Sequence, residues 1–165
     1  MVNDEGLLEK SFGNKLNNIE YHDRVGGYCI IFDQNGRVAI IRTATGYFLL
    51  GGGLDNNETH EECITRECVE EAGLLVSVNH FVCKADKFHW SDTLNYYMHG
   101  IGFFYLADIV ENLGNPKEKD HELVWLTKDE ACKCLFLEHQ SWALERAWVV
   151  HNHMIQKERN CKQNP

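Results

Sequence analysis

One segment constrains the fold of this chain more than any other: three consecutive glycines, residues 51–53, followed by a helix whose two ends can both be located. Thr59 and Glu62 have the spacing of a capping box, in which side chains and backbone groups of the first turn bond reciprocally. Gly73 supplies a stop, because glycine readily adopts the left-handed conformation that follows many helices. The pattern therefore predicts a helix over about residues 60–72. Its predicted buried stripe consists of Ile64, Cys68 and Ala72.

Acidic residues crowd another face of this helix. Glu67, Glu70 and Glu71 stand at positions i, i+3 and i+4, so a helix places their carboxylates together. Each like-charge pair costs roughly 0.2–0.5 kcal/mol on an exposed helix. Arg66 is expected to offset part of this repulsion by reaching Glu62 and Glu70, each four residues away. A solvated acidic face is the simplest explanation of an acidic helix, but such faces usually mix charges of both signs.

A divalent-metal site explains the segment better than a solvated face does. Carboxylates are hard oxygen ligands suited to Mg²⁺ or Mn²⁺, and Mg²⁺ usually shares its remaining positions with water and substrate phosphates. The glycines at 51–53 have two interpretations: a turn with unusual dihedral angles, or a place where backbone approaches a metal or a phosphate closely. A P-loop is excluded, because the chain contains no GxxxxGK[ST] pattern.

The spacing of the whole segment is more specific than any of its parts. Gly52, Glu58 and the run from Arg66 to Leu74 resemble the Nudix box of the Nudix (MutT-like) hydrolase family, whose pattern is G-x5-E-x7-R-E-U-x-E-E-x-G-U with U aliphatic. Every fixed position matches except Cys68, which stands where an aliphatic residue is usual. A buried thiol is a small hydrophobic group, so this departure affects packing rather than chemistry.

The resemblance implies an α/β fold: a Nudix-type α/β/α sandwich with a mixed, mainly antiparallel sheet and the catalytic loop and helix between strands. The remaining pattern agrees. Asn35-Gly36 lies between two apolar runs and predicts a hairpin, because both residues tolerate positive φ. Further strands are predicted at 47–50, 74–88, 96–110 and 124–126, with helices at 128–134 and 139–159. The packing side of the last helix is predicted to comprise Trp142, Ala147, Trp148, Met154 and Ile155.

The chain has 165 residues, which suits one domain. Residues 1–20 are polar and are expected to form a lead-in segment, either a short helix or a loose arm, before a hydrolase domain at 21–165. No apolar run reaches the roughly 18 residues of a membrane span, and residues 1–5 lack the layout of a secretory signal. A soluble cytoplasmic protein that does not bind membranes is expected, with its seven cysteines reduced. The sequence leaves open whether the protein forms a homodimer.

The net charge of −9 argues against polymeric DNA or RNA as a partner, since nucleic-acid-binding proteins usually present a basic face. A phosphorylated small molecule remains compatible with this charge if a cation lies between the two. The resemblance implies such a cofactor, Mg²⁺ or Mn²⁺. It also implies that the protein ligands are a backbone carbonyl of Gly51 or Gly52 and the side chains of Glu67, Glu70 and Glu71.

The family reaction is attack of water on one phosphorus of a nucleoside diphosphate linked to another group. The resemblance implies that Glu58 assists a ligand water or steadies the loop, and that Arg66 orients a neighbouring glutamate. The general base is open. The candidates are Glu67 and Glu70 in the box and Glu122 or Glu118 in a later acidic run; Glu122 is favoured over Glu118, while a solvated loop explains that run equally well.

Three aromatic residues, Phe88, Trp90 and Tyr96, flank a polar turn at 91–95 and are weak candidates for stacking on a base, although strand aromatics are more often core residues. A nucleoside triphosphate, including an oxidised one, or a dinucleoside polyphosphate is the favoured substrate. The alternatives are a non-catalytic nucleotide sensor and a nucleotide-sugar diphosphatase. Relatives that cleave ADP-ribose often carry a proline shortly after the box, and the only prolines here are Pro116 and Pro165.

Overall fold

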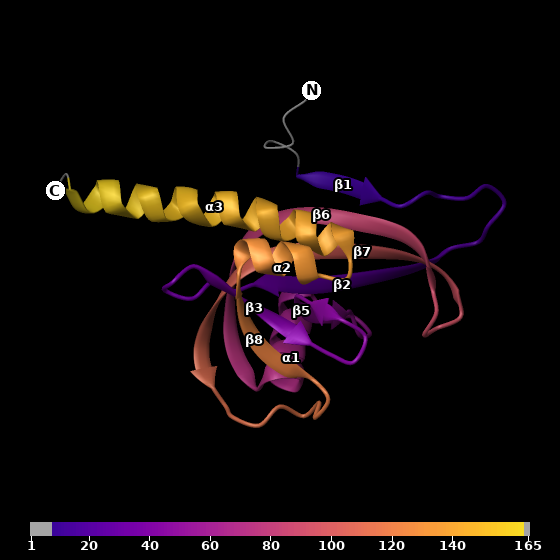
Figure 1. Ribbon diagram of the computed structural model, residues 1–165, viewed down its shortest axis with the longest axis horizontal. Helices are drawn as coiled ribbons and strands as arrows, with labels where there is room; N and C mark the ends of the chain where they lie inside the picture. Colours follow the sequence, from indigo (N-terminus) through magenta and orange to yellow (C-terminus); the bar gives the residue numbers. More distant parts are fainter. Residues whose placement is uncertain (1–7, 164–165) are drawn as a thin grey trace.

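The computed structural model describes residues 8–163, in which helices lie on both sides of two β-sheets (Figure 1). The elements in chain order are β1 (Glu9–Phe12), β2 (His22–Ile30), β3 (Arg37–Arg42), β4 (Tyr47–Phe48), β5 (Leu50–Gly53), α1 (His60–Ala72), β6 (Leu74–Ser91), β7 (Tyr96–Asn112), β8 (Glu122–Thr127), α2 (Lys128–Cys134) and α3 (Glu138–Gln163). Within the described part of the chain, no helix is long and apolar enough to cross a membrane.

The strands form a five-stranded sheet in the order β1-β6-β7-β2-β5 and a three-stranded sheet in the order β4-β3-β8. β1 runs parallel to β6, and β2 runs parallel to β7. The other strand pairs are antiparallel. α1 connects β5 to β6, and the expected mixed, mainly antiparallel α/β/α sandwich is confirmed.

Alternating side chains of the central strands explain the layers. Ile30 of β2 belongs to a core cluster that includes residues of α2 and α3, whereas Cys29 and Ile31 belong to a second cluster that includes residues of α1. Successive side chains of a strand point to opposite faces, so a strand covered on both faces needs a continuous apolar run. The run Val38–Ile41 in β3 divides between the two clusters in the same way.

Helix α1 begins and ends where its sequence predicts. Both halves of the capping box form between Thr59 and Glu62, and Gly73 adopts the left-handed conformation with φ of +63°. A Cβ atom at Gly73 would lie 1.9 Å from the carbonyl oxygen of Gly114, so no other residue fits there without a shift of the backbone. The predicted stripe is confirmed as buried: Ile64, Cys68 and Ala72.

The predicted long strands at 74–88 and 96–110 are also confirmed, as β6 and β7, which pair from Leu74 opposite Asn112 to Ser91 opposite Tyr96. Their paired ends extend beyond the rest of the five-stranded sheet (Figure 1). The predicted helix at 128–134 is α2, and the predicted helix at 139–159 is part of α3.

The prediction of a helix or a loose arm over residues 1–20 was wrong at Glu9–Phe12. Glu9–Phe12 form strand β1 at the edge of the sheet, beside Lys84–Lys87 of β6, rather than a helix or a loose arm. An edge strand is held by backbone hydrogen bonds and does not need an apolar pattern, so its polar sequence gave little signal. The part of this prediction that concerns residues 1–7 lies outside the described residues.

Two turns also differ from expectation. The segment around Asn35-Gly36 does form the predicted antiparallel hairpin, with a bridge between Phe32 and Val38. However, only Gly36 has positive φ, and the longer strands β2 and β3 on either side belong to different sheets. The glycines at 51–53 do not form a turn, because they lie in strand β5 opposite Gly26–Tyr28 of β2. Both differences depend on pairing with distant strands, which local sequence does not encode.

The packing side of α3 was predicted correctly only near the start of the helix. Trp142 and Ala147 are buried, and Trp148 packs edge-on against Phe32 with ring centroids 5.5 Å apart. Met154 is 39% exposed, because the C-terminal half of α3 extends past the sheets (Figure 1).

Candidate active site

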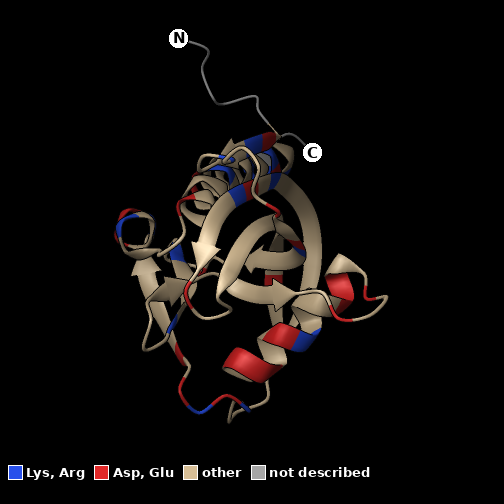
Figure 2. Cartoon of the chain, turned by 90° about the vertical axis from the view of Figure 1, so that its right-hand side faces the viewer, with Lys and Arg blue, Asp and Glu red and all other residues tan. Residues whose placement is uncertain are grey.

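The acidic face of α1 packs directly on the glycine strand β5. The backbone N–H of Gly51 donates to Oε1 of Glu71 at 2.9 Å. A Cβ atom at position 52 would lie 2.6 Å from Oε1 of Glu67, so glycine at this position leaves room for the carboxylate. The strand and the helix are therefore in close contact through carboxylates, and Figure 2 shows the concentration of acidic residues on α1.

Arg66 organises the neighbouring acidic groups. Its guanidinium donates two hydrogen bonds to Glu58, at 2.6 and 2.9 Å, and one to Glu67 at 2.7 Å. It also reaches Glu70 at 3.3 Å. The bond from Arg66 lowers the pKa of Glu58 to about 2, so Glu58 stays ionised.

The expected contact between Arg66 and Glu70 is present, but the expected contact with Glu62 is not. Glu62 instead accepts hydrogen bonds from the backbone and hydroxyl of Thr59 in the capping box. Glu58 also accepts from the N–H of Asp55 at 2.9 Å, so it ties the loop before α1 to the guanidinium. We refer to Glu58, Arg66, Glu67, Glu70 and Glu71 as the carboxylate cluster.

Burial makes two of these carboxylates unusually basic. Glu71 is 6% exposed, and burial raises its pKa to about 8, although the N–H of Gly51 acts in the opposite direction. Burial also raises the pKa of Glu67, against the effect of Arg66. A buried carboxylate is costly to ionise without a positive partner. The oxygen donors and this uncompensated negative charge fit a hard divalent cation.

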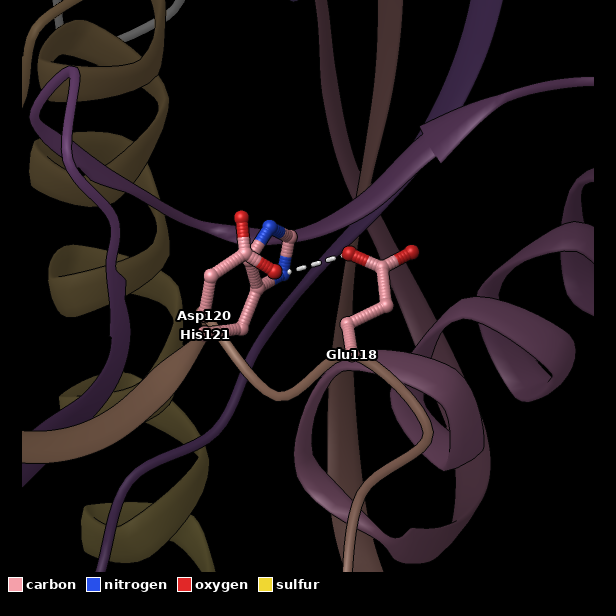
Figure 3. Close-up of side chains that lie close together, drawn as sticks. All are labelled: Glu118, Asp120 and His121. Carbon is pink, nitrogen blue, oxygen red and sulfur yellow. Dashed lines mark ion pairs between the residues drawn. The ribbon is translucent and has the colours of Figure 1, made fainter.

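A loop before β8 approaches the same place from another part of the chain. The N–H of Glu118 donates to the backbone carbonyl of Glu70 at 3.0 Å, which fixes the loop to α1. Nδ1 of His121 lies 2.9 Å from Oε2 of Glu118 and 3.4 Å from Oε2 of Glu71. Glu118, Asp120 and His121 have ligand atoms within 4.8 Å of one another, and Figure 3 shows Glu118 and His121 directed toward each other.

Glu118 and Glu122, the two candidate bases in this run, have different surroundings. Glu122 is the first residue of β8, its side chain is 58% exposed, and it pairs with Arg42 of β3. Glu118 is close enough to the carboxylate cluster to raise the pKa values of Glu67 and Glu71. The sequence drew attention to the run but not to Asp120 or His121, since single polar residues in a loop carry no distinguishing pattern.

Two pockets open beside the cluster, with Glu70 in the lining of one and Glu71 in the lining of the other. The outer pocket, of about 650 Å³, is lined by Thr59, Glu61, Glu62, Thr65, Arg66, Val69, Glu70 and Lys117. The inner pocket, of about 390 Å³, is lined by Tyr28, Thr43, Ala44, Thr45, Phe48, Leu49, Gly51, Glu71, Asp120, His121, Leu137 and Gln140.

The three aromatic candidates lie elsewhere, on the β6–β7 hairpin, and do not line either pocket. Phe88 stacks on His99 with ring centroids 4.0 Å apart, Trp90 packs edge-on against Tyr97, and Tyr96 contacts His22. Trp90 is 44% exposed. A role for these residues in binding substrate stays a prediction.

Oxygen ligands, an ordered arginine and adjoining pockets together suit hydrolysis of a phosphorylated compound. A cation held by carboxylates can neutralise a diphosphate and lower the pKa of a bound water. The partly buried setting strengthens each of these electrostatic effects. The acidic groups lie on α1 beside the glycines of β5, and the apolar lining of the inner pocket comes from β2, β4, Leu49 and Leu137 just before α3.

A family model described as the NUDIX domain matches residues 22–148. Among solved structures, the chain resembles a MutT NUDIX hydrolase from Burkholderia pseudomallei, with 27% identity, a TM-score of 0.59, and coverage of 76% of this chain and 98% of that one. A NUDIX hydrolase from Nitrosomonas europaea is 12% identical with a TM-score of 0.66, covering 78% and 90%. An ADP-ribose pyrophosphatase from Streptococcus suis is 18% identical with a TM-score of 0.56, covering 75% and 90%. No curated protein sequence matches the chain.

Proposed function

Because the chain belongs to the NUDIX family of hydrolases, we propose that it hydrolyses the diphosphate linkage of a nucleoside triphosphate, including an oxidised one, or of a dinucleoside polyphosphate. One observation carries most of this proposal. Glu67 and Glu71 converge on the glycines of β5, and burial raises the pKa of both, which is an arrangement that calls for a cation.

Mg²⁺ or Mn²⁺ would be held by Glu67, Glu70 and Glu71 together with one backbone carbonyl of the glycine strand. Gly51 is the better candidate for that carbonyl, because the carbonyl of Gly52 already accepts a hydrogen bond from the thiol of Cys63 at 3.3 Å. When bound, the ion would supply charge neutralisation of the diphosphate and an acidified water.

The protein groups then have separate tasks. Water attacks one phosphorus, a new P–O bond forms, the bridging P–O bond breaks, and the proton of the water passes to a carboxylate. Glu118 suits this last task better than Glu122, because it lies beside Glu70 and Glu71 rather than in an exposed pair with Arg42.

Arg66 and Glu58 act as positioning residues. Arg66 holds the carboxylates of Glu67 and Glu70 through charge-assisted hydrogen bonds, so that they keep one orientation relative to β5. Glu58 anchors the guanidinium at its other end and ties it to the loop at Asp55. Neither residue needs to contact the reacting phosphorus in order to affect the rate.

A hydrolysis screen tests the proposal, with nucleoside triphosphates, dinucleoside polyphosphates and nucleotide sugars offered in Mg²⁺ or Mn²⁺ and the products identified. We expect cleavage within the diphosphate, its loss in excess EDTA, and a rate lower by roughly 100- to 10,000-fold in Glu70→Gln. Glu145→Gln is the control, because Glu145 is an exposed residue of α3 and lines neither pocket. Undiminished turnover in Glu70→Gln would reject the assignment of this site.

Two other outcomes are informative. Tight nucleotide binding by calorimetry with no hydrolysis in either metal would indicate a non-catalytic sensor. Preferential cleavage of nucleotide sugars would instead place the chain with relatives such as the Streptococcus suis ADP-ribose pyrophosphatase and a UDP-X diphosphatase, to which it is 18% and 15% identical. The complete set of box carboxylates favours catalysis over sensing.

A further inference from the structure

A buried amide beside the carboxylate cluster has no role in the chemistry proposed above. Gln140 lies near the start of α3 and is only 1% exposed, although its side chain is polar. Its Oε1 accepts a hydrogen bond from the backbone N–H of Leu49 at 2.9 Å. The oxygen and the nitrogen of a buried amide normally both have hydrogen-bond partners, so a side-chain nitrogen without a partner in the protein points to a ligand.

That hydrogen bond determines which way the amide faces. A backbone N–H can only donate, so the atom next to Leu49 must be the oxygen of Gln140, and the NH₂ group is turned away from Leu49. Among residues 8–163, this nitrogen has no hydrogen-bond partner. Gln140 lines the inner pocket, where its NH₂ group is a donor available to a ligand.

The rest of the inner pocket suits a flat ring that carries a polar edge. Tyr28, Phe48 and Leu137 contribute apolar side chains to its lining. Glu71 lines the same pocket, so a molecule bound there lies beside the carboxylate cluster. A nucleotide has this combination, because its base is a flat ring with polar edge atoms and its phosphates are suited to a bound cation.

We propose that Gln140 selects the substrate by donating a hydrogen bond from its side-chain nitrogen to a carbonyl oxygen of the nucleobase. This inference rests on the proposed function, because the base can only be placed if the phosphates are at the carboxylate cluster. A base with a ring carbonyl pairs with the buried donor. A base with hydrogen or an amino group at that position leaves the donor unpaired, which costs affinity.

Pairs of substrates that differ by one oxygen test this directly. Inosine 5′-triphosphate carries the 6-carbonyl that purine riboside 5′-triphosphate lacks, and uridine 5′-triphosphate carries the 4-carbonyl that 2-pyrimidinone riboside 5′-triphosphate lacks. We expect the unchanged protein to favour the carbonyl-bearing member of at least one pair by roughly 10- to 100-fold in kcat/KM, mainly through KM.

The same pairs are then measured with Gln140→Met, which keeps the length of the side chain but removes the donor. The preference should fall to within about twofold, and Gln156→Met, at an exposed position of the same helix, should keep it. Because Gln140→Met also leaves the N–H of Leu49 without its acceptor, a thermal melt establishes that the variant is folded. The comparison of substrates on the unchanged protein does not depend on that variant.

The possible failures are distinguishable. If no diphosphate compound is hydrolysed in Mg²⁺ or Mn²⁺, the proposed function is rejected and this inference with it. If hydrolysis occurs but both members of each pair react equally well, the role of Gln140 alone is overturned. A folded Gln140→Met variant that retains the full preference overturns it as well.

Discussion

The carboxylate cluster and the inner pocket adjoin each other but are built in opposite ways. Within the cluster, Glu58 and the residues from Arg66 to Glu71 lie in one short stretch of chain and bond mainly to one another and to β5. The inner pocket gathers residues from β2, the β3–β4 region, the loop before β8 and the start of α3. A single helix can therefore carry the groups that suit phosphate chemistry, whereas the proposed choice of substrate depends on how distant segments pack together.

The two regions also differ in the charge state that suits them. Burial raises the pKa of Glu71 in the cluster to about 8, so without a cation this region favours a bound proton. His139, which precedes Gln140 at the pocket, is 3% exposed, and burial lowers its pKa to about 4, so that region favours a neutral imidazole. Acid should therefore destabilise the protein through His139, whereas Glu71 without a cation should destabilise it only as the pH rises toward 8.

The largest effect is expected for a residue outside α1, and it shows whether the loop before β8 takes part in hydrolysis together with the carboxylate cluster. We expect Glu118→Gln to lower the rate by roughly 100- to 10,000-fold, because Glu118 lies beside Glu70 and is the proposed proton acceptor. Glu122→Gln is the matched control in the same run and should change the rate by less than about threefold, since the pair between Glu122 and Arg42 is exposed. Single-turnover hydrolysis at saturating Mg²⁺ measures both. The reverse order would return the role of base to Glu122.

The residues Glu118 and Glu122 also show which part of the site could be predicted from the sequence and which part could not. The spacing from Gly52 to Leu74 was sufficient to locate α1 and the three carboxylates, because a helix converts spacing directly into a shared face. The sequence analysis favoured Glu122 over Glu118, whereas the proposed function assigns the base to Glu118. Which of them approaches α1 depends on the path of the loop before β8, and a tertiary hydrogen bond from Glu118 to the carbonyl of Glu70 fixes that path.

The same reasoning explains what was missed elsewhere. The glycines at 51–53 were expected in a turn, but their pairing with β2 makes them a strand, and this pairing joins segments far apart in sequence. Gln140 carried no local signal except that it is a polar residue followed closely by buried apolar ones at the start of α3. Residues whose partners lie within a few positions could be predicted, and residues whose partners lie on other elements could not.

A second variant tests the opposite responses of the two regions to pH. The folded pKa of His139 lies below its unfolded value of 6.5, so the unfolded chain binds the proton more tightly. Stability that is present above pH 6.5 should be lost as the pH falls toward 4, by up to about 3 kcal/mol from this residue. His139→Leu should remove that loss. Urea denaturation between pH 4 and 7 measures it as the difference between the two proteins.

His153→Leu is the control for this experiment, because His153 is an exposed residue of the same helix and its replacement should leave the pH dependence unchanged. The positive charge of Lys87 and the nearby His89 also lower the pKa of His139, while Asp86 raises it. Lys87→Met should therefore reduce the acid loss only in part. An acid loss of equal size in His139→Leu and in the unchanged protein would contradict the assignment.

The smallest expected effect is the loss of stability when Arg66, which holds the carboxylates of the cluster in place, is replaced. Arg66→Gln leaves the carboxylates of Glu58, Glu67 and Glu70 without their shared cation. Removing one partner of a buried ion pair destabilises the folded state, because the remaining charges are left without a partner. The side chain of Arg66 is 26% exposed, so we expect a loss of about 2 kcal/mol in the free energy of unfolding rather than the larger cost of a fully buried pair. Arg42→Gln breaks an exposed pair with Glu122 and should cost less than about 1 kcal/mol. If the two variants lost equal stability in urea denaturation, Arg66 would be an ordinary surface cation, and the contrast between an internally ordered cluster and a pocket assembled from distant segments would not hold.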